Sequence, residues 1–219
     1  MHHGSQSILF DLDGTLLDTG LDMGGALNRV LESLGHSALP YERIRPVVSQ
    51  GTAGMFSMSL GISTDDPAYE GLRDRFLNYY ELELCNHTTL FDGMEDVLSH
   101  LDRSDIPWGV VTNKPEYLAR PLLETLGLLA RAACVVGGDT LEKRKPHPAP
   151  LLHGCEVTGS DPARSVYVGD AEGDIRAGRR AGMKTLVATF GYLSDSDRPD
   201  SWGADGMIDH PRDILGWLE

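Results

Sequence analysis

The stretch SILFDLDGTLLD, residues 7–18, decides how the rest of this chain is organised. Its first residues are apolar and partly β-branched, which is typical of a buried strand in a parallel sheet. Two carboxylates, Asp11 and Asp13, follow where that strand must end. Alternating Cβ directions in an extended chain place both on the same side, and Gly14 lets the backbone turn away without a Cβ penalty.

This pair of aspartates allows two interpretations. Like charges so close together repel each other unless a cation lies between them or one of them is protonated. Such a pair therefore suggests a metal or proton-transfer site. Two aspartates that only cap a helix or a turn are the simpler interpretation. The polar clusters that follow other predicted strands decide between the two.

Beyond residue 88, predicted strands and helices alternate along the chain. This alternation implies right-handed βαβ units and a parallel sheet covered by helices on both faces. We therefore predict an α/β fold, a doubly wound parallel sheet with a Rossmann-like core, whose active site lies beyond the carboxyl ends of its strands. The predicted strands are 107–112, 133–136, 165–168 and 184–188, and the predicted helices are 94–101, 115–126, 148–157 and 174–181.

Between residues 17 and 88 the pattern is helical, and no convincing strand occurs before Cys85. Apolar residues recur at helical spacing after Asp18 as far as the stop at Gly35. A short helix is predicted over 41–48, a loop of small polar residues over 49–54, and a long helix that starts with Asp66 as N-cap and Pro67 at its first position. We predict a helical cap domain (17–88) inserted into a core domain formed by 1–16 and 89–219.

Composition excludes several classes of partner. The net charge of −14 disfavours binding to nucleic acid or anionic lipid. No apolar run approaches the ~18 residues that span a bilayer, and no signal-peptide pattern is present, so we expect a cytoplasmic protein without a membrane segment. Three cysteines without CxxC spacing indicate reduced packing thiols. Met1 to Ser5 resembles a start-site remnant, and we assign no site to His2 or His3.

Three further polar clusters follow predicted strands. Thr112 and Asn113 stand between a strand and a helix, where a hydroxyl, an amide and free helix N–H groups form an anion cradle; an ordinary helix cap is the alternative. Lys145 lies in a basic run, in which Lys143 and Arg144 suit a solvated surface and His147 a turn. Asp170 and Asp174 face Asp11 across adjacent strands and form an oxygen-rich site that suits a hard octahedral cation.

The segments DLDGT, VVTNKP, KRKPHP and VGDAEGD resemble, in this order, the four motifs of the haloacid dehalogenase-like hydrolases. The resemblance implies that Asp11 is a nucleophile that attacks phosphorus and that Asp13 is the general acid and base. It also implies that Thr112 and Asn113 bind the phosphoryl oxygens and that Lys145 neutralises their charge. Members that act as dehalogenases lack the second aspartate, so its presence points to phosphoryl chemistry.

The same resemblance implies a Mg²⁺ cofactor. Asp11 and Asp170 would bind the ion through their side chains and Asp13 through its backbone carbonyl. Asp174 would hold a metal-bound water or the lysine. The helical insertion resembles the first cap type of the family, from which we expect substrate contacts at Ser49, Gln50, Gly51 and Thr52, and at Gly14 and Thr15 of the core.

The resemblance leaves the substrate open within one reaction class. VTNKPEYLARPLLETLGL and VGDAEGDIRAGRRAG are similar to the phosphoglycolate phosphatase branch, whereas LFDGM and SWGAD are more similar to N-acetylmuramic acid 6-phosphate phosphatases. We therefore expect Mg²⁺-dependent hydrolysis of a small phosphorylated metabolite through an aspartyl-phosphate, by a monomer or homodimer. A sugar phosphomutase of the same fold and a non-catalytic binding module are the alternatives.

Overall fold

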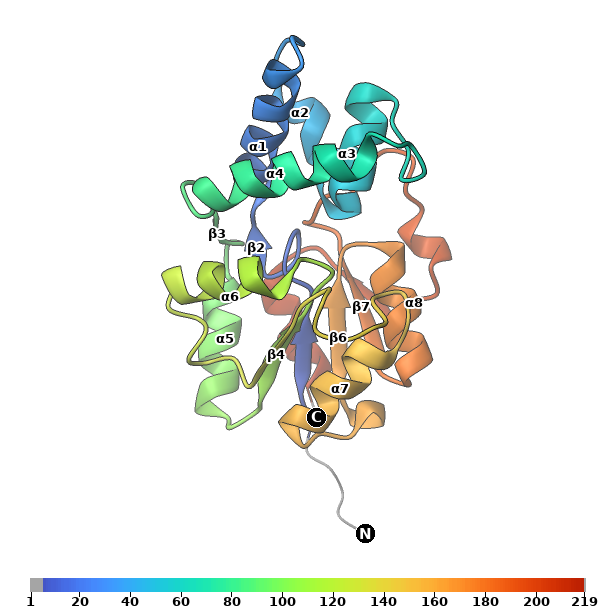
Figure 1. The fold of residues 1–219 in the computed structure, drawn as a ribbon. Helices are drawn as coiled ribbons and strands as arrows, with labels where there is room; N and C mark the ends of the chain where they lie inside the picture. The colour runs from blue at the N-terminus through green and yellow to red at the C-terminus, as the bar shows by residue number, and fades with distance from the viewer. Residues whose placement is uncertain (1–5, 219) are drawn as a thin grey trace.

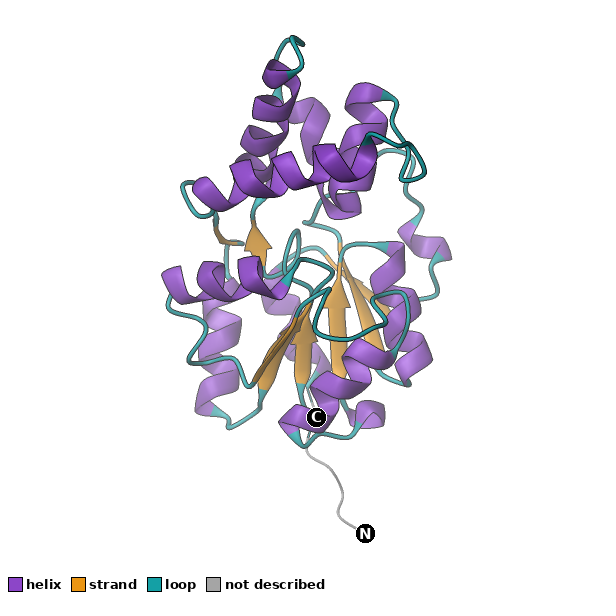
Figure 2. Ribbon diagram, in the orientation of Figure 1, coloured by secondary structure: helices purple, strands orange, loops and turns teal. Residues whose placement is uncertain are grey.

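The computed structural model describes residues 6–218. The interpretation of Met1 to Ser5, with His2 and His3, falls outside these residues. A sheet flanked by helices forms the larger part of the molecule, and a group of helices lies above one edge of that sheet (Figures 1 and 2). This arrangement confirms the α/β fold that the sequence predicts.

Six strands within residues 6–218 form a sheet in the order β5-β4-β1-β6-β7-β8. Every neighbouring pair runs parallel. All carboxyl ends therefore share one edge, and β1 lies centrally between β4 and β6. The strands are β1 (Ile8–Phe10), β4 (Trp108–Val111), β5 (Cys134–Val136), β6 (Val166–Gly169), β7 (Lys184–Ala188) and β8 (Gly206–Ile208).

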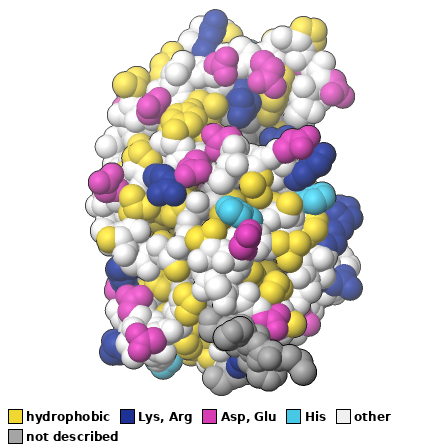
Figure 3. Space-filling model, turned by 60° about the horizontal axis from the view of Figure 1, so that its bottom comes forward, with side chains coloured by type: hydrophobic (Ala, Val, Ile, Leu, Met, Phe, Trp, Pro, Cys, Tyr) yellow, Lys and Arg dark blue, Asp and Glu magenta, His cyan; other side chains and the backbone are white. Residues whose placement is uncertain are grey.

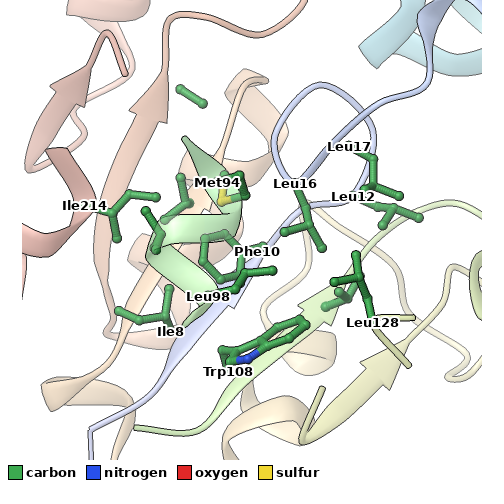
Figure 4. Close-up of a cluster of buried hydrophobic side chains, with 14 of the residues drawn as sticks. Ile8, Phe10, Leu12, Leu16, Leu17, Met94, Leu98, Trp108, Leu128 and Ile214 are labelled. Carbon is green, nitrogen blue, oxygen red and sulfur yellow. The ribbon is translucent and has the colours of Figure 1, made fainter. Parts of the chain in front are cut away.

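Side chains of β1 alternate between two buried clusters, one on each face of the sheet. Ile8 and Phe10 belong to the cluster beneath α5 (Met94–Arg103), α6 (Glu116–Thr125) and η4 (Pro211–Trp217). Leu9 belongs to the cluster beneath α7 (Ala149–Thr158) and α8 (Glu172–Ala181). Figure 4 shows Phe10 between Met94, Leu98 and Trp108. Because both faces of β1 are covered, its end is held rigidly.

Two short 3₁₀ helices, η2 (Pro162–Arg164) and η3 (Pro199–Ser201), lie in the connections between these elements.

The remaining helices lie above the carboxyl edge of the sheet (Figure 1). They are α1 (Gly20–Ser33), α2 (Tyr41–Ile44), η1 (Arg45–Gln50), α3 (Gly51–Leu60) and α4 (Tyr69–Leu82). They share a hydrophobic cluster to which Leu27, Phe56 and Phe76 contribute, and Leu118 and Tyr192 from the rest of the chain also belong to it. We call this group of helices the cap; the domain boundaries at residues 17 and 88 stay a prediction.

Two details of the cap differ from the expectations. Residues 49–54 are helical, not a loop: η1 ends at Gln50, Gly51 turns the chain at φ +62, and α3 starts there. Their small polar side chains mimic a loop, but burial of Met55 and Phe56 on the same helix decides the conformation. The long helix begins at Tyr69 instead of Pro67, because the Asp66 carboxylate accepts the Ala68 N–H (2.8 Å) and holds a turn before the helix.

Short strands were missed by the sequence analysis. β2 (Leu17–Asp18) and β3 (Thr89–Leu90) form an antiparallel ribbon, in which Leu17 pairs with Leu90. The expectation that residues 17–85 contain no strand is therefore wrong at Leu17–Asp18. The ribbon carries both connections between the cap and the rest of the chain. The short strand β8, which was also not predicted, extends the main sheet.

The surface in Figure 3 carries acidic and basic side chains interspersed with apolar ones. The excess of negative charge is therefore not gathered into one patch on that face. Among the described residues, no helix has the length and apolar character needed to span a bilayer. Cys85, Cys134 and Cys155 are free thiols.

Asp22 fixes the second connection to the cap. This α1 side chain is buried and accepts hydrogen bonds from the backbone N–H groups of His87 (3.0 Å) and Thr88 (2.9 Å). The Thr88 hydroxyl donates to the same carboxylate at 2.6 Å. Hydrogen bonds to a charged acceptor are stronger than neutral ones, so this contact ties α1 firmly to the start of β3.

Replacement of Asp22 by Ala should lower the free energy of unfolding by about 3 kcal/mol, because it leaves buried donors without an acceptor. Urea unfolding measures this change. Glu32→Ala, at an exposed position of the same helix, is the control and should change stability by less than about 0.5 kcal/mol. Equal stability of the two variants would contradict the role of Asp22.

Candidate active site

Three buried carboxylates meet at the carboxyl edge of the sheet. Asp11 follows β1, Asp170 follows the neighbouring strand β6, and Asp174 lies in the first turn of α8. One oxygen of each lies within 4.8 Å of the others. The structure thus brings together three of the four residues that the sequence suggests for a metal.

The charge of this acidic cluster (Asp11, Asp170 and Asp174) is not balanced by its protein neighbours. Burial, and then repulsion from Asp11 and Asp174, raises the pKa of Asp170 to about 8. Burial likewise raises the pKa of Asp11 to about 6, although Lys145 opposes the shift. A raised pKa shows that the ionised form is unfavourable without an added positive charge.

Asp170 presents one free oxygen to this cluster. Its Oδ2 accepts hydrogen bonds from the Ser49 hydroxyl (2.5 Å) and the Tyr192 N–H (2.8 Å). Its Oδ1 is buried and has no hydrogen-bond partner in the described part of the chain. An unpaired carboxylate oxygen among all-oxygen donors fits a hard cation such as Mg²⁺.

Lys145 supplies the positive charge within the cluster. Its Nζ lies 2.8 Å from Asp11 Oδ1 and 2.7 Å from Asp174 Oδ1, and it donates to the Tyr167 hydroxyl at 2.8 Å. The Asn113 amide donates to the Lys145 carbonyl (3.1 Å), so this residue holds the loop that carries the lysine. Lys145 and Asp11, which belong to separate motifs of the sequence, are therefore in contact in the structure.

Asp13 points to different partners. Its Oδ1 accepts from the Thr19 hydroxyl at 2.7 Å, and Lys114 Nζ donates to both of its oxygens, at 2.8 and 3.1 Å. The Thr112 hydroxyl accepts the Lys114 N–H at 3.1 Å. Sequence reasoning gave Lys114 no role, although the residue directly follows the Thr112-Asn113 cradle.

Two glycines make room for the carboxylates. Gly14 has φ +80, and a Cβ there would lie 2.1 Å from Asp170 Oδ2. At Gly169, a Cβ would lie 2.4 Å from the Cβ of Asp174. Any larger residue at either position would displace a carboxylate, so the close approach of these acids depends on the glycines.

A cavity of about 690 Å³ lies between the cap and the strand ends, with Asp11, Asp13 and Asp170 on its wall. The segment Ser49–Thr52 also lines this cavity, as does exposed Arg144. Gly14 and the fully buried Thr15 are not on its wall, and neither are Lys143 and His147. The Thr52 hydroxyl is engaged with the Tyr69 hydroxyl at 2.8 Å.

The sequence pattern of the haloacid dehalogenase-like hydrolases matches residues 8–188. The chain belongs to this family. Within the family, it is similar to the phosphoglycolate phosphatase of Xylella fastidiosa, with 44% identity covering 94% of this chain and 90% of that protein. It is also similar to the N-acetylmuramic acid 6-phosphate phosphatase of Pseudomonas aeruginosa, with 38% identity covering 98% of this chain and 95% of that protein.

Solved structures agree with the family. A crystal structure described as a predicted phosphoglycolate phosphatase from Haemophilus somnus superimposes with a TM-score of 0.84 at 26% identity, covering 97% of each chain. This member of the haloacid dehalogenase-like hydrolases is therefore a phosphatase, and its acidic cluster occupies the edge of the sheet where the active site is expected.

Asp170→Asn should raise the melting temperature of the metal-free protein. With its pKa raised to about 8, Asp170 must take up a proton or keep an unfavourable charge when the protein folds near neutral pH, and an amide needs neither. The same variant should lose the stabilisation by Mg²⁺, which in the wild type should reach about 5 to 10 °C at about 100 times the Kd. Differential scanning fluorimetry with EDTA and with Mg²⁺ measures both effects.

Asp65→Asn, an exposed carboxylate in the cap, is the matched control and should keep the wild-type response to Mg²⁺. A full Mg²⁺ response in Asp170→Asn would show that Asp170 does not hold the ion.

Proposed function

We propose that this phosphatase hydrolyses a small phosphomonoester through an aspartyl-phosphate on Asp11, with Mg²⁺ as cofactor. The observation that carries the proposal is the position of Asp11. It lies at the end of the central strand, contacts Lys145 at 2.8 Å, belongs to the acidic cluster and opens onto the cavity. A nucleophile fixed beside a buried ammonium and a cation site suits attack on a phosphate dianion.

The reaction then needs two displacements. A carboxylate oxygen of Asp11 attacks phosphorus, and the bond to the ester oxygen breaks while Asp13, in its protonated form, gives its proton to the departing oxygen. Asp13 next takes a proton from water, whose oxygen attacks the same phosphorus and frees phosphate and the Asp11 carboxylate. Each group ends as it began, so no further reactant is required.

Asp11, Asp170 and the backbone carbonyl of Asp13 would hold Mg²⁺, with Asp174 beside them. The ion would neutralise charge on the phosphoryl oxygens. Lys145 acts on the same oxygens: burial opposes its charge, but Asp11 and Asp174 hold its pKa above the ordinary value. Lys145 therefore stays an ammonium in the working range of pH.

The leading substrate is 2-phosphoglycolate, as the name of the Xylella relative indicates. N-acetylmuramic acid 6-phosphate is the second candidate, supported by the Pseudomonas relative and by the size of the cavity. At about 690 Å³, the cavity is within the ~300–1,000 Å³ typical of ligand sites and is far larger than phosphoglycolate requires. Comparing kcat/KM for these two esters decides between them.

Asp11→Asn should reduce phosphate release by about 10⁴-fold or more, because an amide cannot attack phosphorus. The assay measures inorganic phosphate from p-nitrophenyl phosphate and from both candidate esters. Asp65→Asn serves as the control. Hydrolysis by Asp11→Asn at the wild-type rate would refute the nucleophile assignment, and isomerised sugar phosphate in place of free phosphate would indicate a mutase.

Asp13→Asn should impair alkyl phosphates more than p-nitrophenyl phosphate, because a poor leaving group depends most on proton donation. We expect a loss of about 10²- to 10⁴-fold for the alkyl ester and a smaller loss for the aryl ester. Steady-state kinetics on the two esters measures the difference. An equal loss for both would assign Asp13 a role in the metal site instead.

A further inference from the structure

Lys114 is a buried cation that the proposed chemistry leaves without a task. It follows the phosphate cradle at the end of β4, yet its ammonium contacts Asp13, the proposed proton donor, at 2.8 and 3.1 Å. The side chain lines the cavity and is almost fully buried. A second lysine beside a reacting group, in a chain with a net charge of −14, requires a physical reason.

Two cap residues complete the surroundings of Lys114. Its Nζ lies 4.4 Å from the centre of the Tyr80 ring on α4 and 4.0 Å from the Met23 sulfur on α1. Tyr80 is also buried and lines the cavity, and its hydroxyl has no hydrogen-bond partner among residues 6–218. An unpaired buried hydroxyl is costly, so Tyr80 offers a donor that a bound ligand can use.

The position of this pair relative to Asp13 defines the ligand group that it meets. The ester oxygen of the substrate must come within hydrogen-bond distance of Asp13 to receive its proton. Lys114 contacts the same carboxylate, so an atom one or two bonds beyond the ester oxygen comes next to its ammonium. An ammonium has three N–H groups: Asp13 accepts at most two of them, and the third donates to the Met23 sulfur at 4.0 Å. A thioether is a weak acceptor, so a ligand carboxylate can replace it.

We propose that Lys114 and Tyr80 form the subsite that selects a carboxylate one carbon away from the ester oxygen. The subsite therefore favours phosphate esters of 2-hydroxy acids over esters of neutral alcohols. This inference rests on the proposed function, because it takes Asp13 as the proton donor to the ester oxygen.

Charge explains why the subsite suits an anion. The Lys114 ammonium lies 2.8 Å from Asp13 Oδ1 and so places a positive charge in the wall of the cavity. Burial raises the pKa of Tyr80 to about 12, so this hydroxyl keeps its proton and can donate it. In N-acetylmuramic acid 6-phosphate, the carboxylate lies across the sugar ring from the phosphate and cannot reach the subsite.

The test compares 2-phosphoglycolate with ethyl phosphate, in which a methyl group replaces the carboxylate. The wild type should prefer phosphoglycolate in kcat/KM. Lys114→Met should reduce that preference by about 10- to 100-fold, as expected for loss of a hydrogen bond to a charged group. Lys114→Arg should restore part of it, and Tyr80→Phe should reduce it several-fold while keeping the packing of the ring.

Lys143→Met is the matched control, because Lys143 is exposed and does not line the cavity. It should keep the wild-type preference. Binding of the two esters to Asp11→Asn and to Asp11→Asn/Lys114→Met, measured by titration calorimetry, gives a second readout that needs no turnover. If Lys114→Met fails to fold, Tyr80→Phe carries the test in both assays.

The outcomes separate two possible failures. A wild type that turns over p-nitrophenyl phosphate but shows no preference for phosphoglycolate overturns the subsite and leaves the phosphatase standing. Equal loss on both esters in Lys114→Met also overturns it, because Lys114 would then act only on Asp13. Absence of phosphate release from every ester contradicts the proposed function, and the calorimetric preference still decides whether the subsite exists.

Discussion

The ammonium of Lys145 between Asp11 and Asp174 is the contact on which the rest of this structure depends. Three carboxylates buried within 4.8 Å of one another would repel strongly without it. Burying a charged group is unfavourable unless it has a partner, so the loop after β5 must hold the Lys145 ammonium in contact with both carboxylates. Asn113 holds the lysine backbone and Tyr167 accepts from its side chain, which ties the loop to the end of β4 and to β6, the strands on either side of β1. The sheet order supports this position of Lys145, because β1, which ends at Asp11, lies between β4 and β6.

One ammonium does not neutralise three carboxylates, and this imbalance gives the site its chemistry. The uncompensated charge favours a cation at Asp170, and the cation in turn favours a phosphate dianion. A separate pair is formed by Lys114 and Asp13, which we propose to face the leaving group. The candidate active site therefore contains two lysine–aspartate pairs, and we propose that one acts at the attacking oxygen and the other at the departing oxygen. In this proposal, the pair of Lys145 and Asp11 binds the phosphate that all substrates share, and the pair of Lys114 and Asp13 distinguishes between the alcohols.

The sequence predicted most of the core because its signals are local. The strand at 184–188 and the strand ends at Asp11 and Asp170 follow directly from apolar runs that stop at polar residues. The ribbon of β2 and β3 is too short to produce such a run, and its existence depends on pairing across a long stretch of chain. The sequence did not predict a role for Lys114 for a related reason. Its partners Tyr80 and Met23 come from the cap, and only the tertiary fold brings them together.

The cap does more than cover the cavity, because it contacts the core at chemically important groups. The Ser49 hydroxyl from η1 reaches Asp170, and the Tyr80 ring from α4 covers Lys114. Tyr192 joins these regions: its N–H donates to Asp170, and its hydroxyl donates to Asp18 at the first connection to the cap. A displacement of the cap would therefore remove a partner from Asp170 and expose Lys114 at the same time. In the proposed function, substrate selection and the arrangement of the reacting groups thus depend on the same packing contact between cap and core.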